Sequence, residues 1–331
     1  MLKDIKNIEP DRLSQEELLK TRSAILKEIE NRKNKTRGLD SIEERTTSSN
    51  ELVEKLRSIE KVIYGVDDRK EAYEITNSQL KDGINSVVAL IRNDNISDNG
   101  DGKSTIRTRI FGVARNLCEN EKFYNQPVAP FCSGFLVAKD MIATAAHCVE
   151  NQADLKSIRF VFGFRMKNET EGPMVIDNSD IYEGDNIVKR VFDDTGPDWA
   201  IIKLKRNVVG DHKPVILRRS GKISDNESVY VIGHPVGLPT KFADGANVRN
   251  NNNESFFVCN LDTYGGNSGS PVFNSSTHEL EGILVRGETD FIVTENGCRK
   301  SNVCPQNDPN MVCRGEDCTR STEFVDFVPS N

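Results

Sequence analysis

Three residues whose types can combine in nucleophilic catalysis stand in separate motifs of this 331-residue chain. His147 lies in TAAHC, Asp198 opens DWAIIKL, and Ser268 lies between glycines in GGNSGSP. A serine hydroxyl is a weak nucleophile at neutral pH, so a base must take its proton during attack on a carbonyl. Histidine can accept that proton and return it to the leaving group, while a carboxylate orients the imidazole and stabilises its charged form.

Short strands are expected to position these residues. The stretch 133–148 predicts a strand, a turn at Lys139-Asp140 and a second strand, with His147 at the exit. The glycines around Ser268 predict a tight loop. Further short apolar runs favour a β-barrel over alternating strands and helices; they are 158–164, 199–204 and 229–233.

Taken singly, each motif also fits a packed histidine, a turn acid or a generic loop. In the order His, Asp, Ser, with gaps of 51 and 70 residues, they resemble the signatures of the chymotrypsin-fold serine proteases. The resemblance implies an all-β fold of two six-stranded antiparallel barrels, preceded here by an α-helical segment. It implies that Ser268 attacks, that His147 is the base and then the acid, and that Asp198 orients His147. The backbone N–H groups of Gly266 and Ser268 would bind the oxyanion, and neither a cofactor nor a metal is required.

Two further stretches are similar to the bacterial glutamyl-endopeptidase-like branch of this family. Asn267 precedes the serine where the pancreatic enzymes carry Asp, and VIYGVDDR, from Val62, resembles the mature N-terminus of the branch. The resemblance covers about 62–290. Without an acid before Ser268, the pancreatic activation switch has no partner there. Cleavage at Lys61–Val62 would instead release the preceding segment, as in a zymogen.

The resemblance also suggests a preference for substrates. Asp262 corresponds to the pocket-floor acid of trypsin, which pairs with Arg or Lys; a loop carboxylate outside the pocket is the alternative. Glutamyl endopeptidases use a His in the next strand, where this chain has Leu284. Basic specificity is therefore favoured over acidic. Val285 replaces a serine that supports the catalytic Asp, Arg286 replaces a pocket-wall aromatic, and Gly287 completes the expected pocket.

Eight cysteines accompany the motifs. The resemblance implies a disulfide between Cys132 and Cys148, which would brace His147 and contribute about 3 kcal/mol. Cys118 and Cys259 remain as a second candidate pair. The last 41 residues hold four further cysteines, which are Cys298, Cys304, Cys313 and Cys318. Their spacing lacks the paired C-x2-C of a zinc ribbon. Two further disulfides are therefore favoured over a zinc site.

Composition divides the chain into three segments. Residues 1–61 hold 14 basic and 13 acidic side chains but no aromatic, His or Cys. Helical spacing with a stop near Gly38 predicts a charged helical leader there, either an amphipathic hairpin or extension, or a propeptide or docking segment. Residues 62–290 are the expected trypsin-like protease domain, and 291–331 a Cys-rich C-terminal extension.

The net charge and the length of the apolar runs limit the kinds of partner that are expected. A net charge of −7 argues against nucleic acid, and no apolar run is long enough for a membrane span. Protein or peptide substrates are expected, with a further partner for the leader. The cysteines favour a secreted or periplasmic location, whereas the lack of a visible secretory signal peptide favours the cytoplasm. The alternatives to a general endopeptidase after Arg or Lys are a narrowly targeted regulatory protease, an interaction protein that docks through its leader, and a Glu-specific endopeptidase.

Overall fold

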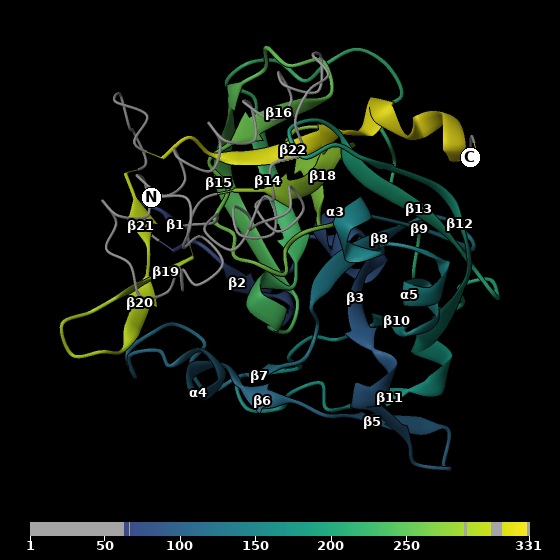
Figure 1. The fold of residues 1–331 in the computed structure, drawn as a ribbon, viewed down its shortest axis with the longest axis vertical. Helices are drawn as coiled ribbons and strands as arrows, with labels where there is room; N and C mark the ends of the chain where they lie inside the picture. The colour runs from purple at the N-terminus through teal and green to yellow at the C-terminus, as the bar shows by residue number, and fades with distance from the viewer. Residues whose placement is uncertain (1–62, 66, 288–289, 306–312, 330–331) are drawn as a thin grey trace, which may run out of the picture.

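The computed structural model describes residues 63–65, 67–287, 290–305 and 313–329, which form two β-barrels side by side with short helices around them (Figure 1). The predicted architecture of two six-stranded antiparallel barrels is confirmed. The predicted helical leader, 1–61, lies outside the described residues.

The first barrel contains the motif of His147. Its strands are closed into a ring in the order β10-β12-β13-β9-β8-β3. The predicted turn at 139–140 joins β8 to β9, and the strands predicted at 158–164 and 199–204 are β10 and β13. The strand bounds are β3 (Val87–Arg92), β8 (Cys132–Ala138), β9 (Met141–Thr144), β10 (Ile158–Phe162), β12 (Ile181–Phe192) and β13 (Asp198–Leu204).

The second barrel closes through pairing of β14 with β15, and a short strand, β2 (Lys70–Glu71), adds to the edge of β15. Its strands are β14 (Ser228–Gly233), β15 (Lys241–Asn250), β16 (Phe256–Cys259), β17 (Pro271–Asn274), β18 (Leu280–Arg286) and β22 (Glu316–Arg320). β22 lies beyond residue 290, where the sequence placed a separate extension, yet it pairs with both β16 and β18. Its five residues, EDCTR, are all buried although four are polar, so their hydrophobicity gave no sign of a barrel strand.

Short elements cover the barrels and their ends. The helices are α3 (Ser78–Ser86), α4 (Phe111–Arg115) and α5 (Gln152–Lys156), with single 3-10 turns η3 (Ala72–Glu74), η4 (Asn93–Asn95), η5 (Ala146–Cys148), η6 (Asn178–Asp180), η7 (Pro235–Gly237), η8 (Ser321–Glu323) and η9 (Val325–Phe327). The small sheets use β1 (Ile63–Tyr64), β4 (Ile96–Asp98), β5 (Lys103–Ile106), β6 (Arg109–Ile110), β7 (Pro127–Val128), β11 (Val175–Asp177), β19 (Phe291–Val293), β20 (Arg299–Ser301) and β21 (Val303–Cys304). Among the described residues, no helix has the length and apolarity to cross a membrane.

Three disulfides join cysteines of the described chain. Cys132 is bonded to Cys148, as the resemblance implied. The proposed pairing of Cys118 with Cys259 is wrong, because Cys118 is bonded to Cys298. Its backbone N–H donates to the carbonyl of Arg299, 2.8 Å away, which aligns the two segments, whereas Cys259 lies inside the second barrel.

The cysteines of the last segment do not gather at one site. Cys304 is bonded to Cys313, and Cys298 is bonded outside the segment. Cys318 is a buried thiol on β22, next to the strand that carries the thiol of Cys259. These four cysteines therefore form neither a zinc cluster nor two disulfides within the segment.

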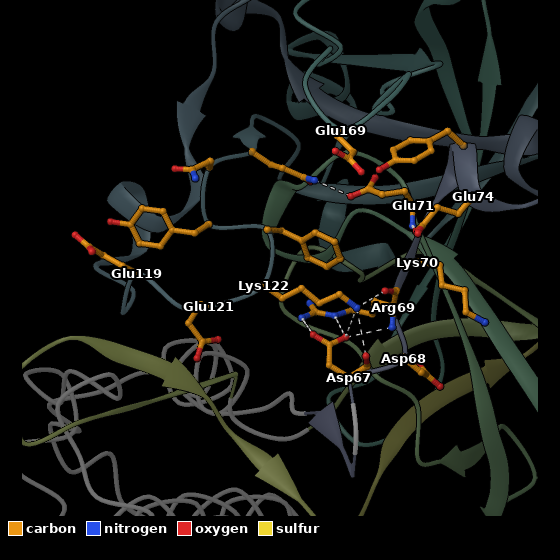
Figure 2. Close-up of a pocket in the computed structure, with 15 residues that line it drawn as sticks. Asp67, Asp68, Arg69, Lys70, Glu71, Glu74, Glu119, Glu121, Lys122 and Glu169 are labelled. Atoms are coloured by element: carbon orange, nitrogen blue, oxygen red, sulfur yellow. Dashed lines mark hydrogen bonds and ion pairs between the residues drawn. The ribbon is translucent and has the colours of Figure 1, made fainter.

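A cavity of about 590 Å³ opens beside β2, where charged side chains predominate (Figure 2). Arg69 is buried there, forms a bidentate ion pair with Asp67, and lies over the ring of Tyr264, 4.1 Å from its centroid. Nearby, Lys241 and Glu71 form a buried ion pair with an N···O distance of 3.1 Å. The cavity lining contains none of the predicted catalytic or specificity residues.

Candidate active site

The pairing of two strands brings His147 and Asp198 together. β9 and β13 are antiparallel neighbours, with Thr144 opposite Ala200. The end of one strand therefore lies beside the start of the other, where η5 carries His147 and β13 begins with Asp198. The Nδ1 atom of His147 lies 2.6 Å from Oδ2 of Asp198, and the backbone N–H of His147 donates to Oδ1 at 3.2 Å.

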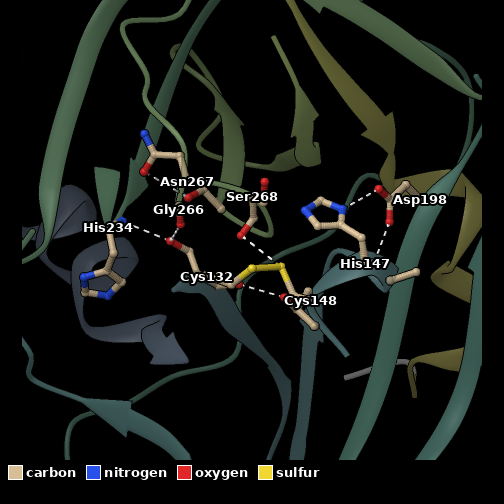
Figure 3. Close-up of a disulfide and its surroundings, with 12 residues drawn as sticks. Cys132, His147, Cys148, Asp198, His234, Gly266, Asn267 and Ser268 are labelled. Carbon is tan, nitrogen blue, oxygen red and sulfur yellow. Dashed lines mark hydrogen bonds and ion pairs between the residues drawn. A yellow bond between two sulfur atoms is a disulfide. The ribbon is translucent and has the colours of Figure 1, made fainter. Parts of the chain in front are cut away.

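The burial of this pair suits a proton-transfer site. The side chain of Asp198 is fully buried, while that of His147 is 15% exposed. Because an ionised carboxylate only accepts hydrogen bonds, Nδ1 carries the proton in this contact. The other nitrogen, Nε2, is then the basic atom of the ring. Figure 3 shows the imidazole between Asp198 and Ser268.

Ser268 lies in the loop 260–270, which we call the serine loop and which joins β16 to β17. Ser133 of β8 fastens this loop to the first barrel. Its backbone N–H donates to the carbonyl of Ser268 at 2.9 Å, and its hydroxyl donates to the carbonyl of Gly266 at 2.9 Å. The same hydroxyl accepts the backbone N–H of His234 at 2.9 Å. A single small side chain thus joins both barrels at the site.

Two glycines allow the serine loop to approach this closely. Gly266 and Gly269 have φ of 86° and 88°, in the left-handed region that side chains disfavour. A methyl group on Gly269 would lie 2.0 Å from the carbonyl oxygen of Ser133, and one on Gly266 would lie 2.8 Å from that of His234. Both positions require glycine for conformation and for space.

The disulfide between Cys132 and Cys148 lies directly beneath the site (Figure 3). Cys132 precedes Ser133 in β8, and Cys148 follows His147 in η5. The sulfur of Cys148 is 3.7 Å from the carbonyl oxygen of Ser268. The disulfide therefore links the chain neighbour of Ser133, which holds the serine loop, to the chain neighbour of His147.

Asp262 faces the N-terminal segment of the described chain. One carboxylate oxygen accepts the backbone N–H of Tyr64 at 2.7 Å, and the other accepts that of Asp68 at 3.1 Å. Burial raises the pKa of Asp262 to about 6, although these two hydrogen bonds oppose the rise. Burial, together with the charge of Asp262, raises the pKa of Asp68 to about 8. The two carboxyl groups are adjacent, and burial disfavours the charged form of each.

The three other predicted pocket residues stand at the end of β18. Val285 is buried, at 2% exposure. The guanidinium of Arg286 pairs with Asp317 of β22 at 3.1 Å and donates to the carbonyl of Gly196 at 2.7 Å. Arg286 therefore braces the loop that leads into Asp198. Gly287 lies against the carboxylate of Glu316.

The structure adds three residues that sequence reasoning did not assign to the site. They are Ser133, Thr319, whose hydroxyl accepts the backbone N–H of Asp198 at 3.1 Å, and Glu316. Ser133 opens the predicted stretch 133–148 that ends with the His motif, so its position could have been noticed in the sequence. Thr319 and Glu316 belong to β22, whose place in the barrel carries no sequence signal.

We expect Ser133→Ala to loosen the serine loop. The change leaves two buried backbone groups, the carbonyl of Gly266 and the N–H of His234, without the hydroxyl. Unpaired buried polar groups cost about 1–3 kcal/mol, so the free energy of unfolding in urea should fall by at least that amount. Ser104→Ala is the control, because that hydroxyl bonds only one side chain, Asn178, away from the site. Equal losses in the two variants would refute the docking role of Ser133.

The paired carboxyls predict a pH dependence of stability. Because folding raises the pKa of Asp68 and Asp262, their contribution is greatest below about pH 4 and is lost as the pH rises to about 8. Asp68→Asn removes one titrating group, so its thermal midpoint should exceed that of the wild type by a margin that grows from pH 5 to pH 8. Lys70→Gln, a substitution on the neighbouring exposed side chain, is the control. A margin that is constant with pH would contradict this prediction.

A family model, described as a trypsin-like peptidase domain, matches residues 132–283. The matched range runs from β8 into β18 and contains all three motifs. Two solved structures align with 81% of this chain, each with a TM-score of 0.46. One is a Glu endopeptidase in complex with MPD, at 17% identity and 97% coverage of that chain. The other is the VesB protease of Vibrio cholerae, at 15% identity and 67% coverage.

Curated relatives match a little under half of this chain. The secreted RxLR effector protein 73 of Plasmopara viticola is 29% identical over 166 residues, which are 45% of this chain and 40% of that protein. The glutamyl endopeptidase of Staphylococcus aureus (strain MRSA252) is 28% identical over 173 residues, 48% of this chain and 45% of that protein. The matches thus span less than half the length of these relatives. Residues 132–283 thus match the model of a trypsin-like peptidase domain, and part of the chain is similar in sequence to the S. aureus glutamyl endopeptidase.

Proposed function

We propose that this protein is a serine endopeptidase that hydrolyses peptide bonds through Ser268, His147 and Asp198. The observation that carries the proposal is the hydrogen bond between Nδ1 of His147 and the buried carboxylate of Asp198, with Ser268 on the other side of the imidazole (Figure 3). This arrangement fixes the tautomer in which Nε2 is free of its proton and can accept one.

The reaction then proceeds in two halves. The hydroxyl oxygen of Ser268 attacks the scissile carbonyl carbon while its proton passes to Nε2 of His147. The carbon–nitrogen bond breaks, the same proton goes to the departing amine, and an ester on Ser268 remains. Water then attacks the ester carbon and gives its proton to Nε2 of His147. The ester carbon–oxygen bond breaks, the peptide leaves with a new carboxyl group, and the proton returns to the oxygen of Ser268. Asp198 stabilises the imidazolium in both halves without taking its proton.

Charge that develops on the carbonyl oxygen needs hydrogen-bond donors. We assign this role to the backbone N–H groups of Gly266 and Ser268. The positive φ of Gly266 and the hydrogen bond from Ser133 to its carbonyl support the assignment, because both hold the peptide groups of the serine loop in one orientation. Each such donor contributes about 3–4 kcal/mol to transition-state stabilisation.

For the substrate we propose peptides cleaved after Arg or Lys. The relatives in S. aureus are glutamyl endopeptidases, so cleavage after Glu is the competing proposal. In this chain Leu284, fully buried on β18, stands where that branch is expected to carry a histidine. An apolar side chain offers no charge or hydrogen bond to a glutamate carboxylate, which favours the basic preference.

We further propose that the protein is made as a zymogen and that cleavage at Lys61–Val62 removes the leader. Contacts of the backbone just after the proposed cleavage site support this proposal. β1 pairs with β21, and Asp262 accepts the N–H of Tyr64, so the start of the catalytic unit is anchored by contacts of its own. A preference for basic residues would let the enzyme cleave after Lys61 itself. A partner that docks on the leader remains the competing proposal.

Ser268→Ala should abolish labelling by a fluorophosphonate probe, which bonds covalently to an activated serine oxygen. It should also lower kcat/KM on chromogenic peptides at least 10⁴-fold, because no other group supplies the nucleophile. Ser270→Ala is the control, since this serine lies in the same loop two residues away. Labelling of Ser268→Ala equal to that of the wild type would overturn the proposed nucleophile.

N-terminal sequencing of the active protein tests the zymogen. We expect the sequence to begin at Val62, and we expect Ser268→Ala, incubated alone, to keep Met1. Lys61→Gln should slow the cleavage, whereas Lys55→Gln should not. Full activity of a chain that still begins at Met1 would contradict leader removal as the activating step.

A further inference from the structure

Hydrogen bonds hold three of the four backbone polar groups of the two glycines that lead to the proposed nucleophile. The carbonyl of Gly266 accepts the hydroxyl of Ser133 at 2.9 Å, and the carbonyl of Gly265 accepts the backbone N–H of Val236. The N–H of Gly265 donates to both carboxylate oxygens of Asp290, each 3.0 Å away. Within the described chain, the N–H of Gly266 has no hydrogen-bond partner. The group left open is thus the one proposed to bind the oxyanion.

These contacts matter because glycine gives the backbone little preference of its own. Without a Cβ atom, Gly265 and Gly266 allow the peptide group between them to rotate at low cost. A trans peptide group is planar, so the C=O of Gly265 and the N–H of Gly266 point in opposite directions. A rotation that turned this carbonyl toward the substrate would turn the N–H away from it. The contacts on Gly265 therefore decide whether the N–H of Gly266 can meet an oxyanion.

The contact from Val236 comes from a constrained turn. Val236 lies in η7, is 5% exposed and has φ of 48°. A β-branched residue disfavours this left-handed region, and such a conformation persists only where the surrounding structure imposes it. In this conformation the N–H of Val236 reaches the carbonyl of Gly265. One side of the peptide group is thus held by a backbone donor in a fixed turn.

The contact from Asp290 comes from the opposite end of the chain. Asp290 directly precedes β19, which pairs with β20 in what we call the C-terminal hairpin. The disulfide between Cys298 and Cys118 fastens this hairpin to the segment that follows α4. Phe291 packs its ring against that of Tyr264 in the serine loop, with 4.8 Å between the ring centroids. A covalent bond and an aromatic contact therefore fix the hairpin that carries Asp290.

We propose that Asp290 is a positioning residue for the oxyanion site. By holding the N–H of Gly265, it keeps the following peptide group in the orientation that directs the N–H of Gly266 toward the substrate carbonyl. This inference rests on the proposed endopeptidase function, and it gives the C-terminal hairpin a part in the proposed reaction. Asp290 acts here through the serine loop and touches no reacting atom.

Asp290→Ala removes the acceptor, whereas Asp290→Asn keeps an amide oxygen that can accept the N–H of Gly265. Asp98→Ala is the matched control, because Asp98 likewise accepts a glycine N–H, that of Gly100 at 2.9 Å, on the separate sheet of β4, β5 and β11. The measurement is kcat and KM on a chromogenic peptide that the wild type cleaves.

We expect Asp290→Ala to lower kcat about 10-fold or more with KM nearly unchanged, because a misdirected N–H loses a contact made only in the transition state. Asp290→Asn should recover most of this loss, and Asp98→Ala should keep the wild-type kcat. The proposal is overturned by an unchanged kcat in Asp290→Ala, by a loss confined to KM, by no recovery in Asp290→Asn, or by an equal loss in Asp98→Ala.

Hydrogen exchange followed by NMR separates this proposal from the proposed reaction. The proteins are the full chain carrying Ser268→Ala, alone or with Asp290→Ala or Asp98→Ala. A hydrogen-bonded N–H exchanges only when its bond opens. The amide of Gly265 should therefore exchange about 10-fold faster with Asp290→Ala but not with Asp98→Ala, and the amide of Gly100 should show the reverse.

The two experiments can fail independently. Faster exchange at Gly265 stands even if the wild type shows no fluorophosphonate labelling, in which case only the proposed reaction fails. If the wild type is labelled but Gly265 exchanges equally in all three proteins, the role of Asp290 fails and the reaction stands. Equal acceleration at Gly265 and Gly100 in one variant would show general loosening of the fold, which also overturns the specific role of Asp290.

Discussion

The hydrogen bonds of Ser133 hold together the two halves on which the candidate site depends. The first barrel carries His147 and Asp198, whereas Ser268 belongs to a loop of the second barrel. Catalysis by this set requires atoms on different barrels to keep a fixed separation. Ser133 provides for this with its N–H and its hydroxyl, which contact the carbonyls of Ser268 and Gly266. The disulfide from Cys132 to Cys148 ties the same strand to the imidazole.

The last strand of the second barrel contacts several residues around the candidate site. β22 completes the ring of strands, and three of its four polar residues contact residues at or next to that site. Thr319 bonds the backbone of Asp198, Asp317 pairs with Arg286, and Glu316 bonds Thr263. A strand built from polar residues can be buried because these hydrogen bonds and ion pairs compensate for lost solvation. The same strand that closes the barrel therefore also makes these contacts.

The N-terminal segment meets the serine loop through Asp262 and through Arg69. Asp262 accepts two backbone N–H groups from residues 64 and 68, and Arg69 lies over the ring of Tyr264. Both contacts end on residues within six positions of Ser268. Under the zymogen proposal, the segment that follows the cleavage site is thus in direct contact with the serine loop, which gives leader removal a physical route to the site.

The sequence alone predicted four of the six strands of the first barrel, because apolar alternation and a two-residue turn are local patterns. Its resemblance to a known family implied the disulfide between Cys132 and Cys148. The partner of Cys118 and the place of Glu316 could not be read in this way, because each depends on residues more than 50 positions away. Asp262 and Thr263 are neighbours in the chain, yet one faces the N-terminal segment and the other faces β22. Only the closed barrel decides which of two nearby acids lies against Gly287, since that depends on long-range strand pairing and not on spacing along the chain.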